Sequence, residues 1–105
     1  MTVYDPEVIR LSPNTILDNF RSRCLDKDYA NFCLKYAVQV LKGYGVICRD
    51  FWARKTVALA IKENLELFGW TWQAERLENW IHFFEREYKD LEARERGDPS
   101  REARH

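Results

Sequence analysis

The sequence predicts an all-α protein, a compact bundle of four helices with short connections. Apolar residues recur at intervals of three and four in four separate segments, and residues that favour helix ends bracket those segments. No convincing pair of β-strands is present. With 105 residues, of which 46% are hydrophobic, the chain has the length and the apolar content of one domain with one core.

The first helix is expected over about residues 13–24. Ser12 is a good N-cap, because its hydroxyl can accept a hydrogen bond from a free amide of the first turn, and Pro13 suits the first helical position. One face carries Ile16, Leu17, Phe20 and Cys24.

The second helix is expected over 28–42 and shows the clearest pattern. Either Asp26 or Asp28 can cap its start, and Gly43 can adopt the left-handed conformation that ends a helix. The face predicted to be buried carries Tyr29, Phe32, Cys33, Tyr36, Ala37, Val40 and Leu41.

The third helix is expected over 50–68, with Asp50 at its start and Gly69 after its end. Trp52 and Leu59 lie off its main apolar face, so the helix is central in the bundle or lies in an interface. The main face carries Phe51, Val57, Ala58, Ile61, Leu65 and Phe68.

The fourth helix is expected over 71–95 and contains three of the four tryptophans, counting Trp70 at its entry. Its core face carries Leu77, Trp80, Ile81, Phe84, Tyr88 and Leu91. Trp72 and Phe83 lie roughly 100–140° from that face, together with Arg76. This helix therefore has a second aromatic stripe.

We expect a single helical domain over residues 1–96, with a short ordered segment at its start, and a flexible, frayed charged tail over 97–105. No apolar run is long enough to span a membrane, and no secretory signal is recognisable at the start. The spacing of Cys24, Cys33 and Cys48 matches no metal or redox motif. A cytoplasmic location with free thiols is therefore predicted.

Charge patterning excludes a strong global field, because 17 basic residues balance 17 acidic ones. The balance is uneven along the chain. Residues 10–62 carry ten Lys or Arg and four Asp or Glu, whereas residues 63–105 carry seven and eleven. A basic half and an acidic half that face each other within the fold explain this best.

The sequence offers little to suggest chemistry. Glu78, His82 and Glu85 share one helical side, but the chain has no partner motif for a metal site. No phosphate loop, nucleophile elbow or dinucleotide fingerprint is present. We therefore expect no enzyme activity, no cofactor and no metal.

The apolar residues outside the core faces have two interpretations: in a small bundle each helix can bury two flanks, or these residues form an exposed surface. The second interpretation predicts a protein–protein interaction or regulatory module, which binds a protein partner or a second copy of itself. Exposed aromatic and arginine side chains are typical of such interfaces. The predicted binding residues are Trp52, Leu59, Trp72, Arg76, Phe83 and Tyr44.

The alternative is a nucleic-acid-associated regulator, which requires that basic residues converge on one face. The candidates are Arg21, Arg23, Lys27, Arg49, Arg54 and Lys55.

Overall fold

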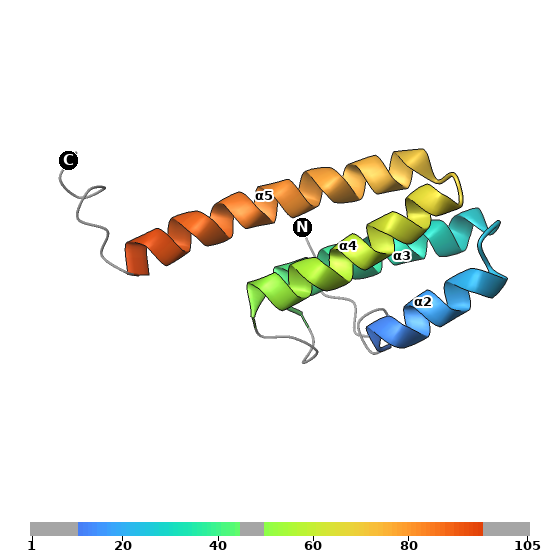
Figure 1. The fold of residues 1–105 in the computed structure, drawn as a ribbon, viewed down its shortest axis with the longest axis horizontal. Coiled ribbons are helices and arrows are strands. Elements are labelled where there is room, and N and C mark those ends of the chain that lie inside the picture. Colours follow the sequence, from blue (N-terminus) through green and yellow to red (C-terminus); the bar gives the residue numbers. More distant parts are fainter. Residues whose placement is uncertain (1–10, 45–49, 96–105) are drawn as a thin grey trace.

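Residues 11–44 and 50–95 are described by the computed structural model, and they form four packed helices without a strand. The helices are α2 (Pro13–Ser22), α3 (Lys27–Lys42), α4 (Phe51–Leu67) and α5 (Thr71–Glu95) (Figure 1). This confirms the predicted all-α bundle. The expected ordered segment at the start of the chain, the ends of the domain and its tail lie outside the described residues.

Side chains predicted as N-caps accept hydrogen bonds from first-turn amides at the starts of α2, α3 and α4. The Ser12 hydroxyl accepts the Thr15 amide at 3.2 Å, and the Asp50 carboxylate accepts the Ala53 amide at 3.1 Å. At α3 the structure decides between the two aspartates, because Asp26 accepts the amide of residue 28 at 2.9 Å.

Two glycines end α3 and close the turn after α4. Gly43 has φ +90° and Gly69 has φ +85°, a region in which a residue with a Cβ is strained. The turn at Gly69 is tight, since the Trp70 amide reaches back to the Leu65 carbonyl at 2.8 Å.

The first helix is shorter than predicted, because α2 ends at Ser22 and not at residue 24. The backbone leaves the helical conformation at Arg23, where φ is −122°. The Asp26 amide then donates to the Arg23 carbonyl at 3.0 Å, which forms a tight corner into α3.

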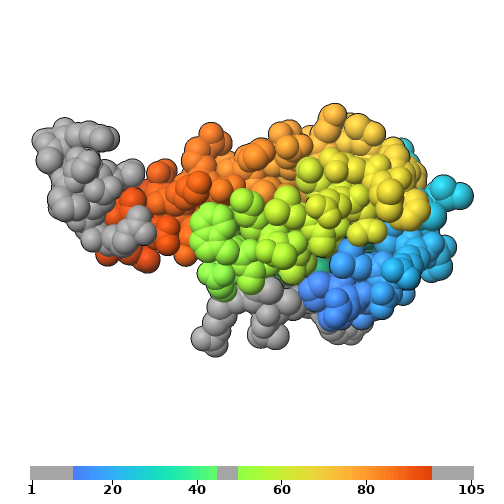
Figure 2. Space-filling view, in the orientation of Figure 1, coloured from blue at the N-terminus to red at the C-terminus, as the bar shows by residue number. Residues whose placement is uncertain are grey.

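Neighbouring helices run in opposite directions along the chain (Figure 1). The helices α3, α4 and α5 pack against one another, whereas α2 packs against α3 and α4 and, within the described residues, not against α5. Figure 2 shows the face on which α4 lies between α2 and α5. The helix α5 has 25 residues against 16 in α3 and 17 in α4, so its C-terminal end projects beyond the bundle.

The core forms where the predicted apolar faces meet. Its members include Ile16, Phe20, Cys33, Tyr36, Ala37, Ala58, Ile61, Leu65, Leu77 and Ile81, all at most 2% exposed. The outer members of the predicted faces, such as Phe32 and Trp80, are only partly buried. Leu91 is 49% exposed, because it lies on the projecting end of α5.

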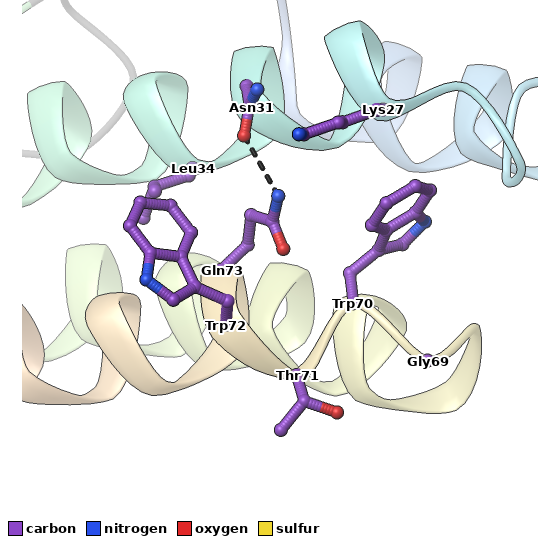
Figure 3. A pocket seen from close by; sticks show the side chains of 8 residues that line it. All are labelled: Lys27, Asn31, Leu34, Gly69, Trp70, Thr71, Trp72 and Gln73. Atoms are coloured by element: carbon purple, nitrogen blue, oxygen red, sulfur yellow. Dashed lines mark hydrogen bonds between the residues drawn. The ribbon is translucent and has the colours of Figure 1, made fainter.

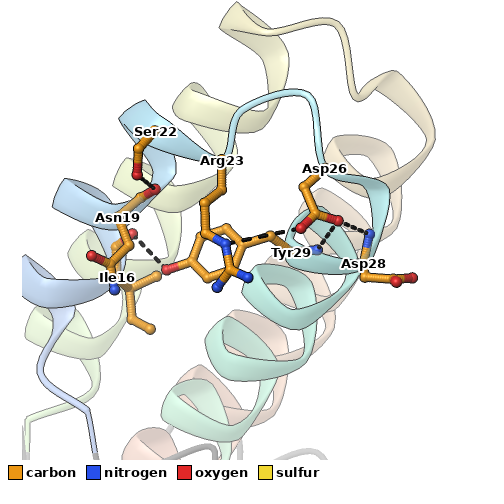
Figure 4. Close-up of polar contacts among 7 residues, drawn as sticks. All are labelled: Ile16, Asn19, Ser22, Arg23, Asp26, Asp28 and Tyr29. Atoms are coloured by element: carbon orange, nitrogen blue, oxygen red, sulfur yellow. Dashed lines mark hydrogen bonds and ion pairs between the residues drawn. The ribbon is translucent and has the colours of Figure 1, made fainter.

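Three aromatic side chains tie the corners of the bundle through backbone carbonyls. The Tyr29 hydroxyl donates to the Ile16 carbonyl at 3.1 Å (Figure 4), and the indole of Trp70 donates to the Cys24 carbonyl at 2.7 Å. The Tyr36 hydroxyl donates to Leu11 at 2.6 Å. The Leu11 and Cys24 carbonyls lie just outside the two ends of α2 and the Ile16 carbonyl lies within it, so these three rings bind α2 and its flanking residues to the rest of the bundle.

Candidate functional site

The helix α5 has two flanks, one toward α3 and one toward α4. Gln73 marks the α3 flank, because its side chain donates to Asn31 at 2.9 Å. Glu85 marks the α4 flank, because its carboxylate accepts from the Lys55 ammonium at 3.0 Å. Phe83 lies two residues before Glu85, hence roughly 200° away around the helix, on the α3 flank.

The aromatic stripe predicted from the sequence lies on the α3 flank. The Trp72 side chain is 58% exposed and the Phe83 side chain 42%. Between them along the helix lies Arg76, whose guanidinium carbon is 5.1 Å from the centre of the Trp72 ring. This cation–π contact holds the guanidinium against the ring instead of leaving it free in water.

Three neighbouring hollows, of about 730, 280 and 340 Å³, lie along α3 and α5; the first is lined from both helices, the second by α3 residues and the third by α5 residues. The third adjoins the first where Arg76 lies over the Trp72 ring, and it adjoins the second where Lys42 approaches the Trp80 ring. The first two share Asn31 and Leu34. Figure 3 shows the largest, with the Gln73–Asn31 bond between the rings of Trp70 and Trp72. We call this feature the α3–α5 groove; its main lining residues are Lys27, Asn31, Leu34, Lys35, Val38 and Lys42 of α3 and Trp70, Trp72, Gln73, Arg76, Trp80 and Phe83 at or on α5.

Aromatic rings form the far end of the groove. Trp80 stacks on Phe84 with ring centres 5.6 Å apart, and Phe83 meets the edge of Trp80 at 5.9 Å. The Lys42 ammonium is 5.9 Å from the centre of the Trp80 ring. These contacts hold a wall of three aromatic rings, of which the Phe83 ring is the exposed one.

The other half of the predicted binding set lies elsewhere. Trp52 is 39% exposed on α4, where its ring meets the edge of Tyr88 at 5.8 Å, beside Lys55. Leu59 and Tyr44 are partly buried and pack against the core. The structure therefore divides the predicted set, and only Trp72, Arg76 and Phe83 line the α3–α5 groove.

Sequence reasoning missed the α3 wall of the groove. Leu34 and Val38 are spaced i, i+4 and lie beside the main apolar face of α3, as partly buried residues. Lys42 follows at the next i+4 position. That spacing indicates a second stripe on α3, beside its main apolar face. The same kind of pattern singled out Trp72 and Phe83 on α5.

The charges on the two flanks of α5 differ. No described Asp or Glu lines the three hollows, and Lys27, Lys42 and Arg76 form no ion pair with any described residue. On the α4 flank, Glu85 binds both Lys55 at 3.0 Å and Lys89 at 3.3 Å. The hydrogen bond from Lys55 is the main cause of a pKa of the Glu85 carboxyl below its ordinary value.

The basic residues of the nucleic-acid alternative do not converge within the described chain. Arg23 and Lys27 lie at the corner between α2 and α3, with Arg23 3.9 Å from Asp26. Lys55 is bound to Glu85 near the other end of the bundle. Arg54 packs over the Phe51 ring at 5.8 Å, Arg21 is exposed on α2, and Arg49 lies outside the described residues.

Two of the three cysteines, Cys24 and Cys33, lie within the described residues. Burial raises the pKa of Cys33 to about 12, so its thiolate is scarce at neutral pH. Cys24 is free and partly buried, and Cys48 lies outside the described residues. Burial is also the main cause of a raised pKa at Tyr29.

The described residues hold no group of three His, Cys, Asp or Glu side chains close enough to bind a metal ion. The His82 ring is 3.5 Å from the Glu78 carboxylate in an exposed i, i+4 pair. Among the described helices, none is long and apolar enough to cross a membrane.

Comparison of the chain with protein-family models gave no match, and no curated protein or solved structure matched it significantly.

Proposed function

We propose that this protein is an interaction module that binds a protein partner through the α3–α5 groove. The observation that carries the proposal is the ladder Trp72–Arg76–Phe83, exposed on the rim of a groove with apolar walls. Tryptophan and arginine side chains dominate the energetics of many protein interfaces. Here they are already held in place, so binding costs less side-chain entropy.

The ladder also supports binding because it adds little to the fold. The buried residues of α5 toward the core are Leu77, Ile81 and Ala74, together with Gln73. A Trp and a Phe that leave 58% and 42% of their surfaces in water contribute less to stability than their size allows. Covering them with a partner recovers that contribution.

The test compares proteins recovered with the tagged full chain and with a Trp72→Ala, Phe83→Ala double variant. We expect a specific partner to be lost from the variant. The matched control is a Leu25→Ala, Leu67→Ala double variant, which removes two leucines that are 85% and 75% exposed and line none of the three hollows. Equal recovery of every partner by all three proteins would reject the proposal.

Self-association is the second form of the same proposal, with another copy of the chain as the partner. Sedimentation of the wild-type protein over a range of concentrations measures it directly. A dimer that the Trp72→Ala, Phe83→Ala variant abolishes would identify the second copy as the occupant.

We also expect a cytoplasmic location, which the free Cys24 and the buried, free Cys33 support.

The nucleic-acid alternative has less support. It requires basic residues on one face, and the described candidates lie at both ends of the bundle. A mobility shift with single- and double-stranded DNA at low salt tests it, because phosphate contacts are strongest there.

A further inference from the structure

We propose that the α3–α5 groove receives an acidic amphipathic helix from a partner protein. The inference rests on the proposed function and adds the chemistry of the ligand. It follows from three properties of the groove. These are its apolar surface, its positive charge without described carboxylates, and walls whose backbone amides and carbonyls are already bonded within helices.

The apolar surface lies on both walls of the groove. Leu34 and Val38 supply it from α3, and Trp72 and Phe83 from α5. In Figure 3 the Trp72 ring lies beside Leu34, across the gap between the helices. A ligand must therefore present apolar side chains toward the base of the groove to displace water from these groups.

The positive charge is distributed along the groove and over both walls. Lys27 lies at one end, Arg76 in the middle of α5, and Lys42 near the other end. None of the three forms an ion pair with a described residue, and no described carboxylate lines the hollows. An apolar ligand without carboxylates would desolvate these cations without replacing the lost hydration. Acidic residues beside the apolar stripe of the ligand would pair with these cations and replace the hydration that they lose.

The backbone of the walls favours a helical ligand. Both walls are α-helices, whose amides and carbonyls bond within the helix, so no free edge is present to pair with an extended peptide. A helix satisfies its own backbone and needs only side-chain contacts. From Lys27 to Lys42 the groove extends about 22 Å, the length of a helix of about 15 residues.

Single-stranded nucleic acid fits these features less well. Bases require open aromatic faces, but Trp80 already stacks on Phe84, and Arg76 covers a face of Trp72. The aliphatic side chains of Leu34 and Val38 also offer no hydrogen bonds to base edges. An acidic helix uses both the apolar base and the charged rim as they stand.

The test is a display library of random 16-residue helical peptides, selected for binding to the immobilised full chain. The peptides carry Leu, Phe or Trp at i, i+3, i+4 and i+7, and all other positions vary over every charge. We expect Asp and Glu to be enriched and Lys and Arg depleted at the positions that flank the apolar stripe. Enrichment of neutral or basic peptides, or of none, would overturn the inference.

Binding of the enriched peptides is then measured by fluorescence anisotropy. A Lys42→Glu, Arg76→Glu variant should weaken it by about tenfold or more, because like charges then meet at the rim. The control is Arg21→Glu, with the same charge reversal per site on α2, which packs away from α5. Unchanged affinity in the groove variant would also reject the inference.

The outcomes separate this inference from the proposed function. Non-acidic peptides whose binding is lost in the Trp72→Ala, Phe83→Ala variant would leave the groove as a binding site and remove the acidic ligand. Oligothymidine or a second copy of the chain that competes with a groove-bound peptide would identify a different occupant, and either result would overturn the acidic helix.

Discussion

The two flanks of α5 use large side chains and charge in different ways. On the α4 flank, Phe51 stacks on Tyr88 at 4.9 Å and Glu85 neutralises Lys55. On the α3 flank, Trp72 and Phe83 project into water and no described carboxylate offsets Arg76. One flank is thus completed within the described chain, whereas the other leaves two aromatic side chains and a positive charge exposed.

This contrast shows why exposure alone does not identify a binding surface. Trp52 is almost as exposed as Phe83, at 39% against 42%. Yet Trp52 lies against Tyr88 and beside Lys55, whose charge Glu85 balances. Phe83 instead borders a hollow together with Arg76, which forms no ion pair with a described residue. The presence of a groove and of uncompensated charge separates the two residues.

The largest expected change in stability comes from a core substitution that affects the packing of both flanks of α5. Leu77 is fully buried between them, so Leu77→Ala should lower the free energy of unfolding by about 2–5 kcal/mol, through lost burial and a residual cavity. Urea denaturation followed by circular dichroism measures the change. The control Leu67→Ala, at a side chain 75% exposed, should change stability by less than about 0.5 kcal/mol.

The next largest change in stability is expected at Trp70, which lies at the start of α5 beside the α3 flank. Trp70→Phe keeps an aromatic ring but removes the hydrogen bond to the Cys24 carbonyl. We expect a loss of about 1–2 kcal/mol, because a partly buried acceptor is left without its donor. A stability equal to wild type in urea denaturation would contradict a structural role for this indole.

A smaller, pH-dependent effect distinguishes the α4 flank. Since the pKa of Glu85 is lowered in the fold, its bonds stabilise the protein fully above the ordinary pKa of 4.5 and are lost as the pH falls through the lower folded value. Glu85→Gln should therefore cost about 0.5–1 kcal/mol at pH 7. The difference from wild type should shrink below pH 4.5.

Denaturation of both proteins across this pH range provides the measurement. Glu78→Gln is the matched control, because that carboxylate is about half exposed and contacts only His82 among the ion pairs. If the difference in unfolding free energy between wild type and Glu85→Gln stayed constant from neutral to acidic pH, the charge of Glu85 would not be its cause.

The smallest expected change in stability belongs to the α3 flank. Trp72→Ala should change the free energy of unfolding by no more than about 0.5 kcal/mol, because most of the side chain stays in water. A loss above about 2 kcal/mol would show that Trp72 supports the fold, and the contrast between the flanks would disappear.

Much of the fold was predictable because local chemistry decides it. Ser12 and Asp50 cap their helices as expected, and Gly43 ends α3 in the left-handed conformation. The choice between Asp26 and Asp28 remained open, since either carboxylate could meet the first free amides. The end of α2 was misplaced because the chain turns at Arg23, whose carbonyl accepts the Asp26 amide and whose guanidinium lies over the Tyr29 ring of α3.

The candidate site was predictable only in part. The angular positions of Trp72 and Phe83 set them apart from the core face of α5, and both are exposed. The same reasoning grouped them with Trp52, which lies on the other flank. An angle about one helix axis shows that a residue leaves the core face, but not which neighbouring helix lies on that side.

The sequence by itself determined where α2 and α4 begin and which side of each helix turns inward, because capping and apolar periodicity act within a few residues. Only the tertiary structure decided that Leu34 and Trp72 line one hollow, that Lys55 meets Glu85, and that Lys42 lies beside the Trp80 ring. These relations depend on how whole helices are placed around one another. Each helix contributes only its own pattern to that arrangement.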